Sequence, residues 1–202
     1  MSICLSHNTA LSVWRAARAS LLPAPSISYA AVPEKVVARE VRALRDSSLS
    51  TIVALERPHL MVASQDGKTS RCSVVCHCPI ASKAPPRLFS INLDVCVVSV
   101  EDVFAQVSLR ASVEALMLLA FELCGSYSLL PDGSFVAAQP LTSVKRLASR
   151  VGALAPFPGS AKAATALRYS FDGAASPAEA KLAMLLCLRQ TLGGYGFPVP
   201  RM

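Results

Sequence analysis

The segment from Cys72 to Cys78 holds the densest set of potential metal ligands in the chain, Cys72-Ser-Val-Val-Cys76-His77-Cys78. A zinc site needs four nitrogen or sulfur ligands that converge on one point. The Val-rich segment is expected to form a strand, in which Cys72, Cys76 and Cys78 share one face while His77 points to the other. No second pair of ligands follows at the usual spacing. We therefore predict buried core cysteines, no metal site and no other cofactor.

The remaining residues that could act in catalysis are scattered. His7, His59 and His77 are isolated along the sequence, and Cys124 has no histidine near it. The Gly-x-Ser-x-Gly motif that presents a serine nucleophile does not occur. The glycine-rich segment 193–196 follows a predicted helix, whereas a phosphate-binding loop opens one. The sequence therefore predicts no catalytic residues.

Basic residues outnumber acidic ones and give the chain a net positive charge. Lys and Arg number 20 against 13 Asp and Glu, a net charge of +7, which favours an anionic partner such as nucleic acid or an acidic protein. One group of basic residues is spaced by four and three, so a helix would present it on one face, where it could contact phosphates. An ordinary solvated helix face is the alternative. The nucleic-acid-binding candidates are Lys35, Arg39, Arg42 and Arg45 in this group, and Lys145, Arg146 and Arg150 in a smaller one.

Composition bounds the class of protein. The 202 residues are 52% hydrophobic and 16% charged, which excludes a disordered chain. No apolar run approaches the ~18 residues of a membrane-spanning helix, so we predict a soluble protein with no membrane partner. Seven cysteines, an odd number at irregular spacing, argue against a disulfide scaffold and favour the cytoplasm. No acidic residue precedes Glu34, so an organellar transit peptide is the alternative for this basic, Ser- and Ala-rich start.

The amino-terminal half is expected to supply the strands. Asp66-Gly67 between two β-rich runs predicts a hairpin with a tight turn. Pro23 and Pro25 should end the first helix and open a loop. The predicted elements are a helix over 6–19, a loop over 20–33, a helix over 33–45, a strand over 51–55, a hairpin over 59–63 and 71–78, and a buried strand over 95–98.

The carboxy-terminal half is expected to be mostly helical. Ser99 and Asp102 come close to a capping box, and Ser176-Pro177-Ala178-Glu179 is a full one with Pro at the first helical position. Gly125 should end a central core helix. The predicted helices begin at 99 and then cover 112–124, 142–151, 161–170 and 178–191, the 142–151 helix with Lys145, Arg146 and Arg150 on its solvent side.

These elements predict an α/β (or α+β) fold, with a small mixed sheet from residues 51–98 covered by helices and a mostly helical carboxy-terminal part. We place the domain boundary near residue 140. The first domain would be 1–140, and 141–202 would be a helical segment.

Three segments resemble a known family. The first is Leu5-Ser-His-Asn-Thr-Ala-Leu11, which is similar to a segment of bacterial abortive-infection type IV antitoxin-like proteins. The strand and helix over 95–107, followed by 118–127, resemble the middle region of the same proteins. The segments 176–182 and 192–200 resemble the first helix and first-strand entry of nuclease domains related to very-short-patch repair endonucleases. Actinobacterial proteins of that kind join these parts in one chain.

The resemblance implies an antitoxin-like α/β domain over 1–140 and the start of a nuclease-like domain over 141–202. The family's upstream winged helix and most of its nuclease sheet have no counterpart here. Only Glu179 matches a nuclease residue, the acid of the first helix, and one carboxylate does not hold a catalytic magnesium ion. A capping-box role explains Glu179 equally well.

The sequence as a whole predicts a non-catalytic regulatory or binding module of an antitoxin-like, nuclease-associated bacterial protein, in contact with nucleic acid or a protein partner. The alternative is a truncated or split endonuclease whose catalytic residues lie outside this chain. The helix over 178–191 is apolar around Leu182, Leu185 and Leu186. We expect it to pack on the 112–124 helix or to mediate self-association.

Overall fold

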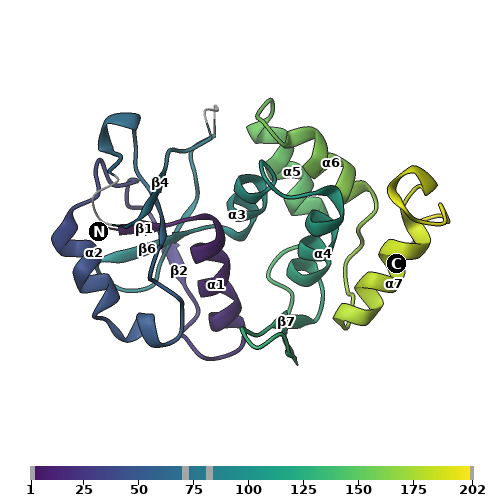
Figure 1. Cartoon of the computed structure of the whole chain (residues 1–202), viewed down its shortest axis with the longest axis horizontal. Coiled ribbons are helices and arrows are strands. Elements are labelled where there is room, and N and C mark those ends of the chain that lie inside the picture. Colours follow the sequence, from purple (N-terminus) through teal and green to yellow (C-terminus); the bar gives the residue numbers. More distant parts are fainter. Residues whose placement is uncertain (1–2, 70–72, 81–83, 201–202) are drawn as a thin grey trace. The chain divides into compact units, whose positions relative to one another are not determined.

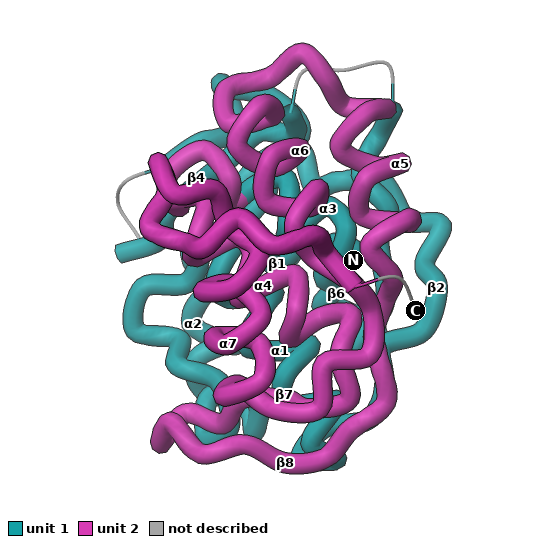
Figure 2. The backbone as a smooth tube through the Cα atoms, turned by 90° about the vertical axis from the view of Figure 1, so that its right-hand side faces the viewer, with its two compact units in different colours: residues 1–106 teal, residues 107–202 magenta. Residues whose placement is uncertain are grey.

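The structure is a computed structural model that describes residues 3–69, 73–80 and 84–200. The chain divides into two compact units, Met1–Gln106 and Val107–Met202, coloured teal and magenta in Figure 2. Together they confirm the predicted mixed α/β class. The two units meet in the sequence at residue 106, whereas the sequence analysis placed a domain boundary near residue 140; the helix over 113–124 belongs to unit 2 and packs with its helices.

Unit 1 is built on a mixed six-stranded sheet with the order β2-β5-β6-β1-β3-β4. Strands β1 and β6 are parallel, as are β3 and β4, while the remaining neighbours are antiparallel. The central pair β1 and β6 is fully buried and contains only Ile, Leu, Val and Cys, the pattern expected of strands covered on both faces. The strands are β1 (Ile3–Leu5), β2 (Ser26–Ser28), β3 (His59–Met61), β4 (Val75–His77), β5 (Leu88–Ser90) and β6 (Val95–Val98).

Helix α1 (His7–Arg18) follows β1 directly (Figure 1) and packs against β3 and β6. Its buried Trp14 donates its indole N–H to the carbonyl oxygen of Val98 at 2.9 Å and meets the ring of Phe89 edge-on. Helix α3 (Val100–Val107) begins after β6, where Ser99 caps it by accepting a hydrogen bond from the backbone N–H of Asp102. The predictions of the first helix, the 95–98 strand and this cap are confirmed.

Two predicted elements of unit 1 are wrong. Residues 51–55 form no strand, because the chain turns through a short 3-10 helix, Ser48–Thr51, held by local Ser and Thr hydrogen bonds. The predicted hairpin does not form either: β3 and β4 are parallel neighbours, so the connection between them is a crossover, and Gln65–Gly67 is another 3-10 helix. In addition, the predicted loop over 20–33 contributes edge strand β2, and helix α2 (Ala38–Arg45) starts five residues later than expected.

Unit 2 is organised around α4, which contacts α6, α7 and β7. Ser112 caps α4 through the backbone N–H of Ala115. Gly125 ends it with an extended backbone, and a Cβ there would collide with the carbonyl oxygens of Phe121 and Ala174. The elements are α4 (Val113–Cys124), the hairpin β7 (Tyr127–Leu129) and β8 (Phe135–Ala137), α5 (Val144–Leu154), α6 (Ser160–Arg168), α7 (Pro177–Cys187) and the 3-10 helix Gln190–Leu192.

The last helix packs on α4, as one of the two sequence alternatives predicted. Its buried face consists of Ala180, Ala183 and Cys187. Leu182, Leu185 and Leu186, which were expected on the packed face, are 55%, 45% and 36% exposed. Helix α7 ends at Cys187 instead of Thr191, and self-association through its leucines stays a prediction. In the described part of the chain, no helix has both the length and the apolar character needed to cross a membrane.

Candidate metal centre

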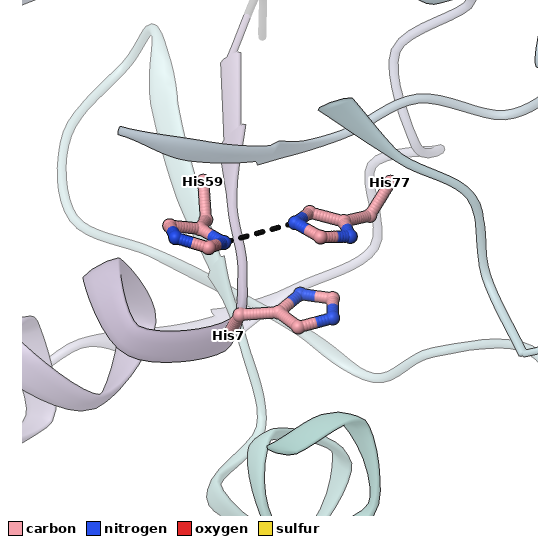
Figure 3. A group of neighbouring side chains, drawn as sticks. All are labelled: His7, His59 and His77. Atoms are coloured by element: carbon pink, nitrogen blue, oxygen red, sulfur yellow. Dashed lines mark hydrogen bonds between the residues drawn. The ribbon is translucent and has the colours of Figure 1, made fainter. Parts of the chain in front are cut away.

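Three histidines from separate parts of the sequence meet where β1, β3 and β4 lie side by side in the unit 1 sheet (Figure 3). His7 is the first residue of α1, directly beyond the end of β1, and His59 is the first residue of β3. Because β1 and β3 are antiparallel, the end of one lies beside the start of the other, and the backbone N–H of Ser6 donates to the carbonyl oxygen of His59 at 3.0 Å. The sheet therefore brings His7 and His59 together.

The register of β3 and β4 adds the third histidine. His59 pairs with Val75, so His77 lies two positions further along β4 and on the same face of the sheet. Such diagonal neighbours are within reach of ring side chains. Nδ1 of His59 lies 2.9 Å from Nε2 of His77, a hydrogen bond whose donor depends on the tautomer.

The His7 ring completes the cluster by stacking. Its centroid lies 3.6 Å from that of His77, and the two ring planes differ by 22°. The ring of His59 lies 5.7 Å from that of His7. All three side chains are half-buried, and one ring nitrogen of each lies within 4.8 Å of the others.

Backbone contacts hold the histidines in place. The N–H of His7 donates to Oε1 of Gln106, and the N–H of His59 donates to Oγ1 of Thr9, both at 2.9 Å. His7 adopts a left-handed backbone conformation with a φ of 49°, which is uncommon for a residue with a side chain. Such a conformation costs energy and persists only where the surrounding structure stabilises it. Conformations of this kind are found most often at functional sites.

The distances between the ring nitrogens are near those of a tetrahedral zinc site. Two nitrogen ligands about 2.05 Å from zinc lie about 3.3 Å apart, so the 2.9 Å pair needs to open only slightly. The widest pair closes by up to about 1.5 Å, since no pair exceeds 4.8 Å. To hold a metal ion, the rings would also have to turn from their nearly parallel planes so that their lone pairs converge, and the hydrogen bond between His59 and His77 would be replaced by two bonds to the metal.

The sequence interpretation of these histidines as isolated is wrong in space. They are separated by 52 and 18 residues, and only the pairing of β1 with β3 and of β3 with β4 unites them. No local spacing could have indicated that pairing, especially since β3 and β4 were expected to be antiparallel.

Among the described residues, the Cys-rich motif that was considered for zinc contributes His77 and no thiol to this cluster. Cys72 lies outside the described residues. The thiol of Cys76 hydrogen-bonds to the carbonyl oxygen of Thr69 at 3.4 Å, and Cys78 is half-buried. In the described part of the chain, the three histidines are the one group of three or more His, Cys, Asp or Glu residues placed to hold a metal ion.

The prediction of buried core cysteines is wrong for Cys76 and Cys78, which are half-buried, whereas Cys4, Cys96, Cys124 and Cys187 are buried. Cys4 and Cys96 are opposite each other on β1 and β6 and are 1% and 0% exposed. The hydrogen bond to Cys96, together with burial, raises the pKa of Cys4 well above its ordinary value. Burial likewise raises the pKa of Cys187. Thiols of this kind stay protonated and are poor nucleophiles.

The first group of basic candidates is divided by the structure. Lys35 precedes α2, and Arg39 and Arg42 are exposed on it. Arg45 is half-buried and donates to the carbonyl oxygens of Leu55, Glu56 and Ser73, so it fastens loops to α2. A cavity of about 540 Å³ lies beside α2 and is lined by Arg39, not by the histidines.

The second group loses one member. Lys145 and Arg146 are exposed on α5, but Arg150 is 7% exposed, which corrects its predicted place on the solvent side. Glu179 accepts a hydrogen bond from the backbone N–H of Ala175 at 2.7 Å, while its own N–H donates to Oγ of Ser176. The Ser176 half of the predicted capping box is present, while the Glu179 carboxylate binds the N–H of the residue before the N-cap. This local role accounts for Glu179 without a nuclease role.

Comparisons with known proteins do not identify the chain. No protein-family model matches it, and neither the curated proteins nor the solved structures gave a match. The functional assignment therefore depends on the geometry of the sites.

Proposed function

We propose that unit 1 is a metal-binding domain that holds one zinc ion with the imidazoles of His7, His59 and His77. The observation that carries this proposal is the convergence of the three side chains, with one ring nitrogen of each within 4.8 Å of the others. Zinc is the metal of choice because it accepts three or four nitrogen ligands in tetrahedral geometry without a redox change.

The arrangement of supporting contacts also favours a metal. Metal-binding histidines depend on neighbours that fix the direction of the ring. Here Ser6 Oγ lies 3.2 Å from Nδ1 of His7, and the backbones of His7 and His59 are anchored by Gln106 and Thr9. The anchors come from α1 and α3, which begin at the same edge of the sheet.

The test is a zinc titration of the full chain, produced without a histidine tag and stripped with a chelator. Competition with a chromophoric chelator gives the stoichiometry and the affinity. We expect one zinc per chain, and a loss of affinity of at least about 100-fold in His59→Ala and in His77→Ala, because each removes one of three ligands. The matched controls are Cys76→Ser and Cys78→Ser, which leave the histidines intact and should bind as the wild type does.

The controls separate the two possible zinc sites. Loss of binding in the cysteine variants, with retention in His59→Ala, would move the site to the Cys-rich motif. A chain that binds no zinc at micromolar concentration, yet shows the helical circular dichroism of a folded protein, would reject the proposal.

A second candidate function is nucleic-acid binding through α2. Arg39 and Arg42 are exposed about one turn apart on α2, and Lys35 is exposed in the segment just before the helix. Exposed cations that lie close together in the chain can contact phosphates, and the counterions they release make the affinity fall with salt. Arg45 is excluded from this surface because its guanidinium binds loop carbonyls.

Binding to a fluorescent duplex at several salt concentrations tests this function. Replacing Lys35, Arg39 and Arg42 with Ala should remove up to three phosphate contacts and flatten the slope of log affinity against log salt by up to about 2.7. The matched control replaces Lys145 and Arg146 on α5. Equal slopes in wild type and the triple α2 variant would reject this surface.

The resemblance to antitoxin-like and nuclease-associated proteins stays a hypothesis about biological setting. It is compatible with either proposed activity, and the setting proposed from it is that of a regulatory module in a bacterial cytoplasm. Under the alternative of a split endonuclease, reading the genomic DNA beyond Met202 should reveal an Asp and a Glu-x-Lys pattern. Absence of that pattern in every frame would remove the alternative.

A further inference from the structure

The number of ligands at the histidine cluster determines what a bound zinc ion can do. Zinc prefers four ligands, and structural sites fill all four positions with protein groups, whereas catalytic sites leave one for water. Within the described residues, the cluster contains His7, His59 and His77 and no further His, Cys, Asp or Glu at ligand distance. The three side chains are half-buried, so solvent reaches them.

The charge of the ligand set also favours a zinc ion that binds and activates water. Three neutral imidazoles leave the full double positive charge on zinc, and such a site lowers the pKa of zinc-bound water far below that of bulk water, to about 7. The first turn of α1, where His7 lies, contains no acidic residue that would offset this charge. A zinc ion in this place would hold a hydroxide near neutral pH.

From this we infer that the zinc site of unit 1 is hydrolytic: its zinc keeps an exchangeable fourth position and uses the bound hydroxide to cleave small carboxylic esters. The inference rests on the proposed zinc binding and assigns a substrate class to it. A carbonyl substrate fits a single ion, because zinc polarises the carbonyl oxygen and delivers the hydroxide. Phosphodiester cleavage commonly uses two ions about 3.5–4 Å apart, and the cluster has ligands for one.

The proposed reaction is a simple addition and elimination. The zinc-bound hydroxide oxygen forms a bond to the carbonyl carbon, and the carbonyl π electrons move to the oxygen, which zinc stabilises. The tetrahedral adduct then collapses and the C–O bond to the leaving group breaks. The leaving alkoxide takes the electron pair of that bond and the proton of the added hydroxyl, which leaves a carboxylate on zinc. Water displaces the carboxylate from zinc and loses one proton to solvent, so the sum is ester plus water giving acid plus alcohol.

The open position has a spectroscopic test that is independent of turnover. Cobalt(II) in place of zinc gives intense visible absorption when it is tetrahedral. Titration of the cobalt-loaded full chain with azide should shift that spectrum to saturation, because azide takes the exchangeable position. A tetrahedral spectrum that azide leaves unchanged would mean a closed, structural site and would overturn the inference while zinc binding stands.

The activity test uses p-nitrophenyl acetate as the probe, with zinc-loaded and chelator-stripped full chain at equal concentration. Free imidazoles also hydrolyse this ester, and zinc that merely occupied them would lower the rate. We therefore expect the opposite, an increase of at least about 10-fold on loading, abolished in His77→Ala and retained in Cys78→Ser. A rate that stays equal or falls when one zinc is bound overturns the inference. A chain that binds no zinc overturns the proposed function as well.

Discussion

The two units of this chain differ in how far apart in sequence their neighbouring residues are. Unit 1 places β1 between β6 and β3, so residues near 5, 60 and 97 lie side by side. Unit 2 joins α4 to β7, β7 to β8 and α5 to α6, elements that follow one another in the chain, and closes with α6 and α7 on α4. The candidate chemistry lies in unit 1, where distant segments meet.

The difference extends to what is buried. The core of unit 2 is dominated by α4, with Leu116, Met117, Phe121 and Leu123 at 0% exposure. Unit 1 also has an apolar core, but it holds three half-buried imidazoles at the rim of its sheet. Helices with an apolar stripe provide a stable scaffold from local sequence, whereas a cluster of polar side chains requires strands paired across long loops.

The largest effect is expected in the core of unit 2. Phe121 is fully buried and meets Phe171 edge-on with 5.0 Å between ring centroids. Phe121→Ala should lower the free energy of unfolding by about 3–5 kcal/mol, because it removes buried apolar contacts and leaves a cavity. Urea unfolding followed by far-ultraviolet circular dichroism measures the loss. Phe135→Ala is the control, since that ring is 49% exposed; equal losses in the two variants would contradict the assigned core.

The next effect should appear in unit 1 and depend on zinc. Trp14, the one tryptophan of the chain, lies on α1, whose first residue is His7, so its fluorescence reports on the unit that holds the cluster. At a free zinc concentration of 100 times the dissociation constant, a ligand that binds only the folded state adds about 2.7 kcal/mol. We expect that gain in urea unfolding followed by Trp14 fluorescence.

Two comparisons make this measurement specific. His77→Ala should show no zinc-dependent gain, while Cys78→Ser should show the wild-type gain. Because neutral imidazole is the ligand, the gain should also shrink as the pH falls from about 7.5 to about 5.5, where free histidine becomes protonated. A gain of equal size in His77→Ala would mean that zinc stabilises the protein elsewhere.

The sequence predicted the helices well because their signals are local. Helix α4 begins after the predicted Ser112 and ends at the predicted Gly125, and Ser176 caps α7 through the N–H of Glu179 as expected. Such a cap depends on residues within one turn, so spacing alone reveals it. The end of α7 was missed by four residues because Leu188 turns into an extended conformation, which no local glycine or proline marks.

The sheet and its site were harder to predict, because no short segment of the sequence shows which strands pair with one another. Asp66-Gly67 has the composition of a hairpin turn, yet the chain there makes a 3-10 helix and β4 returns parallel to β3. Gly67 packs against the backbone of Glu34, a contact 33 residues away that replaces the turn. The histidine cluster was equally hard to predict, since its three side chains meet only when β1, β3 and β4 are paired in the observed register.

A smaller effect tests an interaction in unit 2 between residues that are close in the sequence. The hydroxyl of Ser176 accepts the backbone N–H of Glu179 at 3.2 Å at the start of α7. Ser176→Ala should cost about 1 kcal/mol, since it leaves that N–H without a partner. Chemical unfolding followed by circular dichroism measures it, with Ser149→Ala inside α5 as the control for loss of an exposed hydroxyl. If both substitutions leave stability unchanged, the cap contributes nothing and α7 depends on its contacts with α4 alone.

The smallest effect is expected at the turn of the β7–β8 hairpin in unit 2, where Asp132 accepts hydrogen bonds from the hydroxyl and the backbone N–H of Ser134 at 2.6 and 2.9 Å. The Ser134 hydroxyl, followed by its N–H, lowers the pKa of the Asp132 carboxyl below its ordinary value. A carboxyl whose pKa is lower in the folded state binds fewer protons there than in the unfolded chain. Its stabilising contribution is therefore present at neutral pH and is lost as the pH falls through the folded pKa.

Side-chain NMR titration of Asp132 should accordingly give a pKa below that of an ordinary aspartate, and Ser134→Ala should move it back up. The stability difference between wild type and Asp132→Asn should be small at pH 7, because the carboxyl is fully exposed and solvent screens it. That difference should vanish on acidification. Gly133, at a φ of 84°, keeps the turn in shape in both variants, so the titration isolates the carboxylate itself. A pKa of Asp132 that Ser134→Ala leaves unchanged would show that this hydrogen bond, the most local interaction in the comparison, does not form in solution.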